Sequence, residues 1–169
     1  MGSKAAVLTM TLLFTGSAVA QVTWGKQTLK RGKLWATIWN SLQFGDPTET
    51  ENGFYTLDYP GYSKATNVND ALNYAEAVGY ALYGIREATA FSYTINSRFF
   101  PSGQDIFPIE EATLTENYNL RDPGVAGEEI VSGAHHVNGL NVDISHRSMV
   151  WSYPGLSDFI IQEITITNN

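Results

Sequence analysis

Hydrophobic and polar positions alternate most regularly in the last stretch of the chain, residues 159–167. Almost every residue there is aromatic, β-branched or otherwise suited to a pleated strand. Ile160, Ile164 and Ile166 share one face, because successive side chains of a strand point to opposite sides. The first half of the run is apolar on both faces. This predicts a strand buried between two layers and paired with residues 148–152; the alternative is a plain C-terminal edge strand.

Shorter runs with the same period predict further strands, separated by turn residues. The strongest signal is Asn138-Gly139, which joins the alternating runs 128–137 and 140–146. Asn-Gly in that position is typical of a tight hairpin. The other predicted strands cover residues 34–40, 79–86 and 91–100.

Three segments have weaker patterns. Residues 106–109 are apolar but contain Pro108, which predicts an edge or irregular piece. Residues 110–120 fit one helical turn or a loop, and residues 70–78 have the composition of a short helix. With about seven short strands and at most one short helix, the sequence predicts a mainly β fold, an antiparallel β-sandwich-like module.

Residues 1–20 have the layout of a secretory signal peptide. Lys4 provides the positive charge, an apolar stretch follows, and Ala18-Val19-Ala20 forms a small-x-small cleavage site. The alternatives are an uncleaved anchor or a core helix. We expect no other transmembrane helix, since no other stretch is long and apolar enough. Residues 21–33 are predicted to form an exposed leader or the first edge strand.

The rest of the chain, residues 34–169, is predicted to be one β-rich module. The strong final strand is followed directly by Asn168-Asn169, which resembles the opening of a turn. We therefore expect the module to be truncated at its C-terminus, and thus to be an incomplete part of a longer protein.

Composition narrows the function classes. The 169 residues carry a formal net charge of −7, and the largest basic cluster is Lys30-Arg31-Gly32-Lys33. A nucleic-acid partner is therefore excluded, because such proteins present a basic face. The chain has no cysteine, so it uses neither disulfides nor thiol chemistry. In an exported chain, the absence of cysteine fits a bacterial extracellular or cell-surface protein better than a small disulfide-stapled extracellular module.

The three histidines fall close together and suggest a candidate metal site. Imidazole and carboxylate groups are zinc ligands, and His136, Asp143 and His146 lie on the two arms of the predicted hairpin. His135 is excluded from the same site as His136, since adjacent residues of a strand point to opposite faces. The alternative is that these histidines have ordinary surface or interstrand partners.

Two tryptophans suggest a second candidate site. Trp35, Thr37 and Trp39 fall on one face of a predicted strand and would form a flat platform for sugar rings. The alternative is packing in the core, where tryptophan is commonly found.

Paired carboxylates are candidate catalytic groups. Glycosidases place two carboxylates on either side of the scissile bond. Neighbouring residues such as Glu110-Glu111 or Glu128-Glu129 diverge on a strand, so neither pair indicates convergence. We assign no catalytic residue and no cofactor from the sequence.

Part of the chain resembles a known group of proteins. The segment 152–168, with its Asp158-Phe159-Ile160-Ile161 run, is similar to a segment near the start of large, secreted, uncharacterised surface proteins of Bacteroidota-type bacteria. The segments 103–108 and 32–35 are also similar to that group. The resemblance implies a β-rich N-terminal module of a longer parent that often ends in a sorting domain for type IX secretion. It implies no catalytic residues.

These observations predict a non-catalytic module of an exported or cell-surface protein, with a structural, adhesive or glycan-binding role. Its expected partners are glycans or other surface proteins. The alternative is the N-terminal part of a secreted hydrolase, such as a glycoside hydrolase. Its catalytic residues would lie mostly downstream or include Glu128, Glu129 and Asp143.

Overall fold

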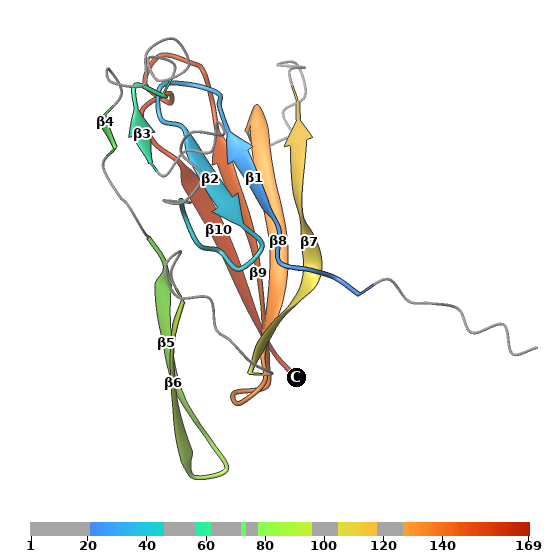
Figure 1. Ribbon diagram of the computed structural model, residues 1–169. Helices are drawn as coiled ribbons and strands as arrows, with labels where there is room; N and C mark the ends of the chain where they lie inside the picture. Colours follow the sequence, from blue (N-terminus) through green and yellow to red (C-terminus); the bar gives the residue numbers. More distant parts are fainter. Residues whose placement is uncertain (1–20, 46–56, 62–71, 74–77, 96–104, 118–126) are drawn as a thin grey trace, which may run out of the picture.

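The computed structural model is mainly β, and its strands pair in antiparallel fashion (Figure 1). The structure describes residues 21–45, 57–61, 72–73, 78–95, 105–117 and 127–169. Within them the strands are β1 (Lys26–Leu29), β2 (Ala36–Trp39), β3 (Asp58–Tyr59), β4 (Leu72–Asn73), β5 (Tyr80–Arg86), β6 (Thr89–Ile95), β7 (Ile106–Glu116), β8 (Glu129–Val137), β9 (Val142–Val150) and β10 (Ile161–Asn168). The predicted mainly β, antiparallel, sandwich-like fold is confirmed. The predicted signal peptide, residues 1–20, lies outside the described residues.

A four-stranded sheet with the order β10-β9-β8-β7 forms one layer (Figure 1). The hairpin predicted at Asn138-Gly139 joins β8 to β9, and Asn141 closes the turn with a positive φ of 55°. The Asn141 N–H donates to the Asn138 carbonyl at 3.1 Å. Asparagine tolerates this left-handed conformation. The hairpin is confirmed, but its loop covers residues 138–141, because Val137 pairs with Val142, whereas a two-residue Asn-Gly turn would pair Val137 with Leu140.

Two hairpins cover the inner face of this sheet. The β1–β2 hairpin lies over β7 and β8, and Leu29, Ala36 and Ile38 are fully buried against the sheet. The β5–β6 hairpin covers the end near the β8–β9 turn, where Ile95 packs with Ile144 and others in a second apolar cluster. The alternating pattern of these strands thus places their apolar sides inward, as a sandwich requires.

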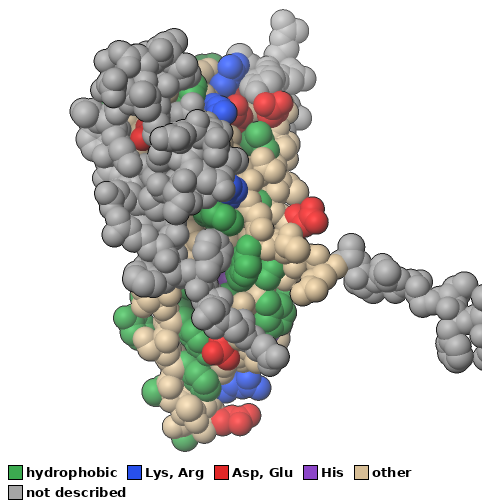
Figure 2. Space-filling view, viewed as in Figure 1, with side chains coloured by type: hydrophobic (Ala, Val, Ile, Leu, Met, Phe, Trp, Pro, Cys, Tyr) green, Lys and Arg blue, Asp and Glu red, His purple; other side chains and the backbone are tan. Residues whose placement is uncertain are grey.

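The outward side of the β5–β6 hairpin remains apolar. Tyr83 and Ile85 are 71% and 76% exposed. Figure 2 shows hydrophobic side chains along this hairpin, at the lower end of the molecule.

The part of the chain that the structure describes contains no helix with the length and apolar character needed to span a bilayer.

A close approach between the layers occurs at Gly133 of β8. A Cβ atom at this position would lie 2.6 Å from both Cα and Cβ of Asn40. Asn40 is fully buried, and its Nδ2 donates to the carbonyls of Thr23 and Glu110, at 3.0 and 2.9 Å. Asn40 therefore links the β1–β2 layer to β7, and only glycine leaves room for it at position 133.

Strand β10 differs from the prediction in its burial. It pairs with β9 from Ile161–Met149 to Asn168–Val142, so a strand paired with its predecessor is confirmed. It is nevertheless an edge strand: Ile164 and Ile166 are 48% and 57% exposed. The prediction of burial between two layers is wrong, because the covering β1–β2 hairpin lies over β7 and β8.

The segment before β8 was also predicted incorrectly. Residues 106–116 form one edge strand, where an edge piece followed by a helical turn or loop was expected. Two irregularities interrupt its register with β8, between Pro108 and Glu110 and between Glu110 and Thr113. Proline is tolerated because one side of an edge strand needs no partner.

The predicted helix at residues 70–78 is not observed where the structure describes it. Leu72 and Asn73 form strand β4, which pairs with β3. The remaining residues of that segment, apart from Val78, lie outside the described ranges. For Leu72 and Asn73, pairing with β3 in the folded chain outweighs the helical propensity of the local sequence.

Candidate binding site on the outer face of the four-stranded sheet

The outer face of the four-stranded sheet carries rows of mostly polar side chains across all four strands. Strand pairing defines these rows, since directly paired residues lie on the same face. From β7 to β10 the rows are Thr113-Ser132-Arg147-Glu163, Glu110-Ala134-Ser145-Thr165 and Phe107-His136-Asp143-Thr167.

A hollow of about 260 Å³ lies over the first two rows. Its lining includes Ser132 and Ser145 at the centre, and Glu110, Arg147 and Glu163 further out. Ala134 lies between them and is 2% exposed. Ser132, Ala134 and Ser145 are small residues on the two central strands, and the longer side chains of Glu110 on β7, Arg147 on β9 and Glu163 on β10 surround them, which leaves a depression in the surface.

Arg147 and Glu163 form an ion pair on the rim of the hollow. The Arg147 Nη1 lies 3.2 Å from Glu163 Oε2, and the two side chains are 46% and 57% exposed. An exposed pair of this kind stabilises a protein by only about 0–1 kcal/mol. Both groups can therefore exchange this contact for hydrogen bonds to a ligand at small cost.

Glu110 is held in place through its backbone. Its carbonyl accepts a hydrogen bond from Asn40 Nδ2. Glu110 pairs with Ala134 of β8, and the register of the two strands shifts on either side of this pair. Its side chain is exposed, and among the described residues its carboxylate has no hydrogen-bond or ion-pair partner. This carboxylate remains available to a ligand.

The third row places an aromatic ring and a histidine beside the hollow. Phe107 is 43% exposed, and its ring centroid lies 5.0 Å from that of His136. His136 Nδ1 donates to Asp143 Oδ1 at 2.5 Å. This hydrogen bond, with a second one from Asn169, holds the pKa of Asp143 below its usual range, so Asp143 is ionised at neutral pH.

The predicted metal ligands do not converge. His136 and Asp143 are neighbours on the outer face, but His146 lies on the inner face opposite Gly133 and is 2% exposed. The reason is the alternation of side chains along β9, where positions 143 and 146 differ by an odd number. Within the described ranges no group of three potential ligands could hold a metal ion.

The predicted aromatic platform is largely covered. Thr37 is fully buried, and its hydroxyl lies 3.0 Å from that of Thr28. Trp35 and Trp39 are half-buried, and their indole N–H groups donate to the carbonyls of Gly32 and Gly45. The two rings therefore flank a buried position and do not form one continuous open surface.

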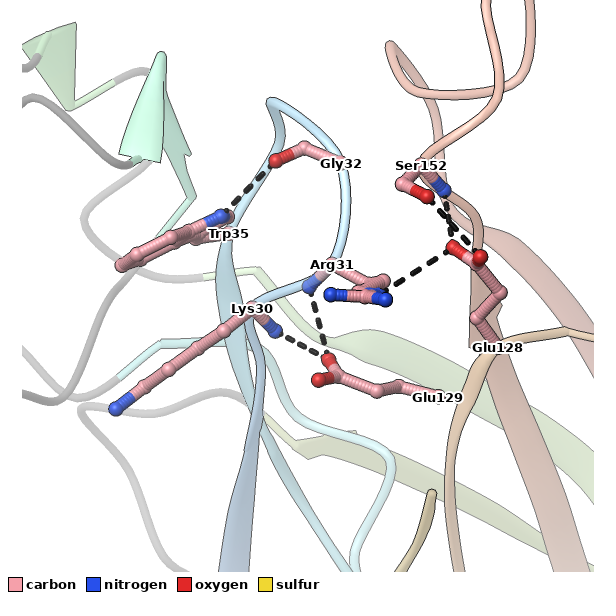
Figure 3. Close-up of polar contacts among 7 residues, drawn as sticks. All are labelled: Lys30, Arg31, Gly32, Trp35, Glu128, Glu129 and Ser152. Atoms are coloured by element: carbon pink, nitrogen blue, oxygen red, sulfur yellow. Dashed lines mark hydrogen bonds and ion pairs between the residues drawn. The ribbon is translucent and has the colours of Figure 1, made fainter. Parts of the chain in front are cut away.

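Glu128 and Glu129, the carboxylates considered for catalysis, serve as anchors for the loop that joins β1 to β2 (Figure 3). Glu129 Oε2 accepts hydrogen bonds from the backbone N–H groups of Lys30 and Arg31, at 2.6 and 2.9 Å. Glu128 accepts from the N–H and hydroxyl of Ser152 and lies 3.5 Å from Arg31 Nε. Both acids are about 95% buried, and these hydrogen bonds satisfy their carboxylates.

We predict that Glu129→Gln lowers the free energy of unfolding by about 1–2 kcal/mol, because an amide oxygen accepts the two backbone hydrogen bonds less strongly than a carboxylate. Urea denaturation measures this change. Glu116→Gln is the matched control, since Glu116 pairs with Glu129 in the register but is exposed. Equal stability of the two variants would contradict the anchoring role.

Sequence reasoning missed Phe107, Arg147 and Glu163 as members of a site. The Asn-Gly signal did indicate that β8 and β9 are neighbours, but the pairs Ser132–Arg147 and His136–Asp143 depend on the four-residue loop 138–141. The residues from β7 reach the site through the irregular pairing of β7 with β8, and those from β10 through its pairing with β9. The sequence pattern reveals neither register.

Comparison of the chain with protein-family models, curated protein sequences and solved structures finds no significant match. The candidate site is therefore supported by its geometry alone.

Proposed function

We propose that this chain is a non-catalytic module of an exported bacterial surface protein, and that it binds glycans through the outer face of the four-stranded sheet. The observation that carries this proposal is the hollow between Glu110 and Glu163, with Arg147 at its rim and Phe107 beside it. Export is supported by the signal-like pattern of residues 1–20.

The chemistry of the hollow suits a sugar. Each sugar hydroxyl both donates and accepts hydrogen bonds, and the hollow offers guanidinium donors, carboxylate acceptors and hydroxyl groups that do both. Phe107 adds an exposed apolar ring at the edge, which suits the C–H face of a pyranose. A volume of about 260 Å³ lies just below the ~300–1,000 Å³ of typical ligand pockets. It therefore suits a short oligosaccharide end better than a large ligand.

The competing function is glycoside hydrolysis, since two carboxylates line the hollow. A hydrolase holds its acid and its nucleophile or base on opposite sides of the bond and excludes bulk water around them. Here Glu163 is ion-paired with Arg147, and both Glu163 and Glu110 are exposed. This geometry favours binding over bond cleavage.

A glycan array followed by calorimetry on the selected ligand tests the proposal. Arg147→Ala and Phe107→Ala are each expected to weaken binding about tenfold, corresponding to about 1.4 kcal/mol. Arg86→Ala and Tyr83→Ala are the matched controls, because both side chains are exposed on the β5–β6 hairpin away from the hollow. We expect these controls to bind as the parent chain does.

Two results would overturn the proposal. One is unchanged binding in both outer-face variants, or loss of binding only after Trp35→Ala and Trp39→Ala, which would move the site to the predicted platform. The other is hydrolysis of the bound oligosaccharide that is lost in Glu110→Gln or Glu163→Gln, which would make the chain an enzyme.

A further inference from the structure

The outer-face hollow carries a net negative charge. Glu110 and Glu163 contribute two carboxylates and Arg147 contributes one guanidinium, which leaves −2 + 1 = −1. The neighbouring row adds the ionised carboxylate of Asp143, which is hydrogen-bonded to His136. The chain as a whole is also acidic, with a formal net charge of −7. The field over the hollow therefore attracts cations and repels anionic groups.

Within the hollow the charges are not equivalent. Arg147 is engaged by Glu163 at 3.2 Å, so these two groups largely cancel. Glu110 comes from the opposite side of the sheet, on β7, and its carboxylate has no partner among the described residues. Its backbone is fixed by the Asn40 hydrogen bond, so the carboxylate extends from a rigid position. The Glu110 carboxylate is thus an unpaired, negatively charged hydrogen-bond acceptor in the same hollow as the hydroxyl groups of Ser132 and Ser145.

We propose that the hollow selects amino sugars, that is, glycan residues carrying a protonated amino group, and that Glu110 binds that ammonium group. This inference rests on the proposed glycan-binding function and adds the class of sugar. An ammonium has three donors and a positive charge, which match a lone carboxylate. The adjacent sugar hydroxyls contact Arg147 and the serine hydroxyls. An N-acetyl group removes the charge, and a uronic acid carboxylate reverses it.

The test compares three oligosaccharides of equal length by calorimetry: glucosamine, N-acetylglucosamine and galacturonic acid oligomers. We expect the glucosamine oligomer to bind about two- to fivefold more tightly than the N-acetylated one, and the acidic oligomer to bind most weakly. The preference should fall when salt is added, because the contact is exposed. It should also fall when the pH is raised above the pKa of the sugar amine.

Glu110→Gln is expected to remove this preference, so that the glucosamine oligomer binds no more tightly than the N-acetylated one. Glu111→Gln is the matched control, since it removes the same charge from the next exposed residue, which does not line the hollow. The inference is overturned if the parent chain binds the neutral oligomer equally well, or if both variants lose the preference to the same extent. Those outcomes leave the proposed function standing. Failure to bind any glycan would instead remove the proposed function.

Discussion

Acidification from about pH 6.5 to about pH 4 is expected to remove several kcal/mol from the free energy of unfolding. The cause is a pair of histidines enclosed between the layers, His135 and His146, which are 0% and 2% exposed. Burial is the main reason that the pKa of each is lowered to about 4. Backbone groups of Asn40 and Trp39 partly offset this burial effect.

The direction of the effect follows from proton linkage. Between pH 6.5 and pH 4 the unfolded chain binds protons at these two positions, whereas the folded chain keeps both rings neutral. Acid therefore favours unfolding in this window, and the stabilisation is complete only above the unfolded pKa. One pKa unit corresponds to about 1.4 kcal/mol, so each histidine accounts for about 3 kcal/mol, which is large against a typical stability of about 5–15 kcal/mol.

The contacts around His135 explain why its charged form is poorly tolerated. Its Nε2 contacts the Tyr80 hydroxyl, and its Nδ1 lies 3.3 Å from the Asn40 carbonyl. In the neutral ring, Nδ1–H donates to this carbonyl and Nε2 accepts from tyrosine. Burial also raises the pKa of Tyr80, so tyrosine remains a neutral donor. Electrostatic interaction with His146 and His136 lowers the pKa of His135 further, and interaction with Asp143 raises it.

Urea denaturation at a series of pH values measures the effect, and His146→Leu provides the test. Neither ring nitrogen of His146 completes a hydrogen bond within the described structure, so a leucine at this position loses little at neutral pH. It should remove about half of the acid sensitivity. His136→Gln, on the outer face, should retain all of it. A free energy of unfolding that is constant across this pH window would contradict the enclosed position of the two rings.

Gly133→Val is expected to destabilise the fold by about 3 kcal/mol or more. The added Cβ would lie 2.6 Å from the Cα of Asn40, a backbone atom that cannot rotate away. Valine adds two further methyl groups, so the β1–β2 hairpin must move off the sheet or Asn40 must give up its hydrogen bonds to Thr23 and Glu110. Thermal and urea denaturation measure the loss.

Ser132→Val is the matched control for this substitution. It lies one residue earlier on β8, introduces the same side chain, and points to the outer face. We expect a change within about 1 kcal/mol, because that face has open space above it. Similar losses in both variants would indicate that strand propensity, rather than the close approach of the layers, controls stability at this position.

Several parts of the fold were predictable because they depend on contacts close in sequence. The existence of the β8–β9 hairpin follows from Asn138-Gly139 between two alternating runs, although the loop, residues 138–141, is two residues longer than a tight Asn-Gly turn. The β5–β6 pair follows from two alternating runs close together in the chain. In these cases turn chemistry and a period of two are sufficient, since each choice is made within a few residues.

The candidate site was less predictable because its residues come from strands whose placement is not local. Glu110 reaches the outer face only because the pairing of β7 with β8 is irregular on both sides of it. Trp35 and Trp39 matched a platform in pattern, yet Thr37 between them is fully buried. His146 matched a metal ligand in spacing, yet lies on the other side of the sheet.

By itself the sequence determined the β character of this protein, its antiparallel hairpins and the alternation of faces along each strand, because these depend on side-chain type and on the geometry of neighbouring residues. Only the tertiary structure decided which of those faces are covered. The β1–β2 hairpin lies over β7 and β8, so β10 keeps Ile164 and Ile166 exposed while His135 and His146 are enclosed. Burial depends on contacts between distant segments, and a pattern with a period of two is the same whichever side the second layer covers.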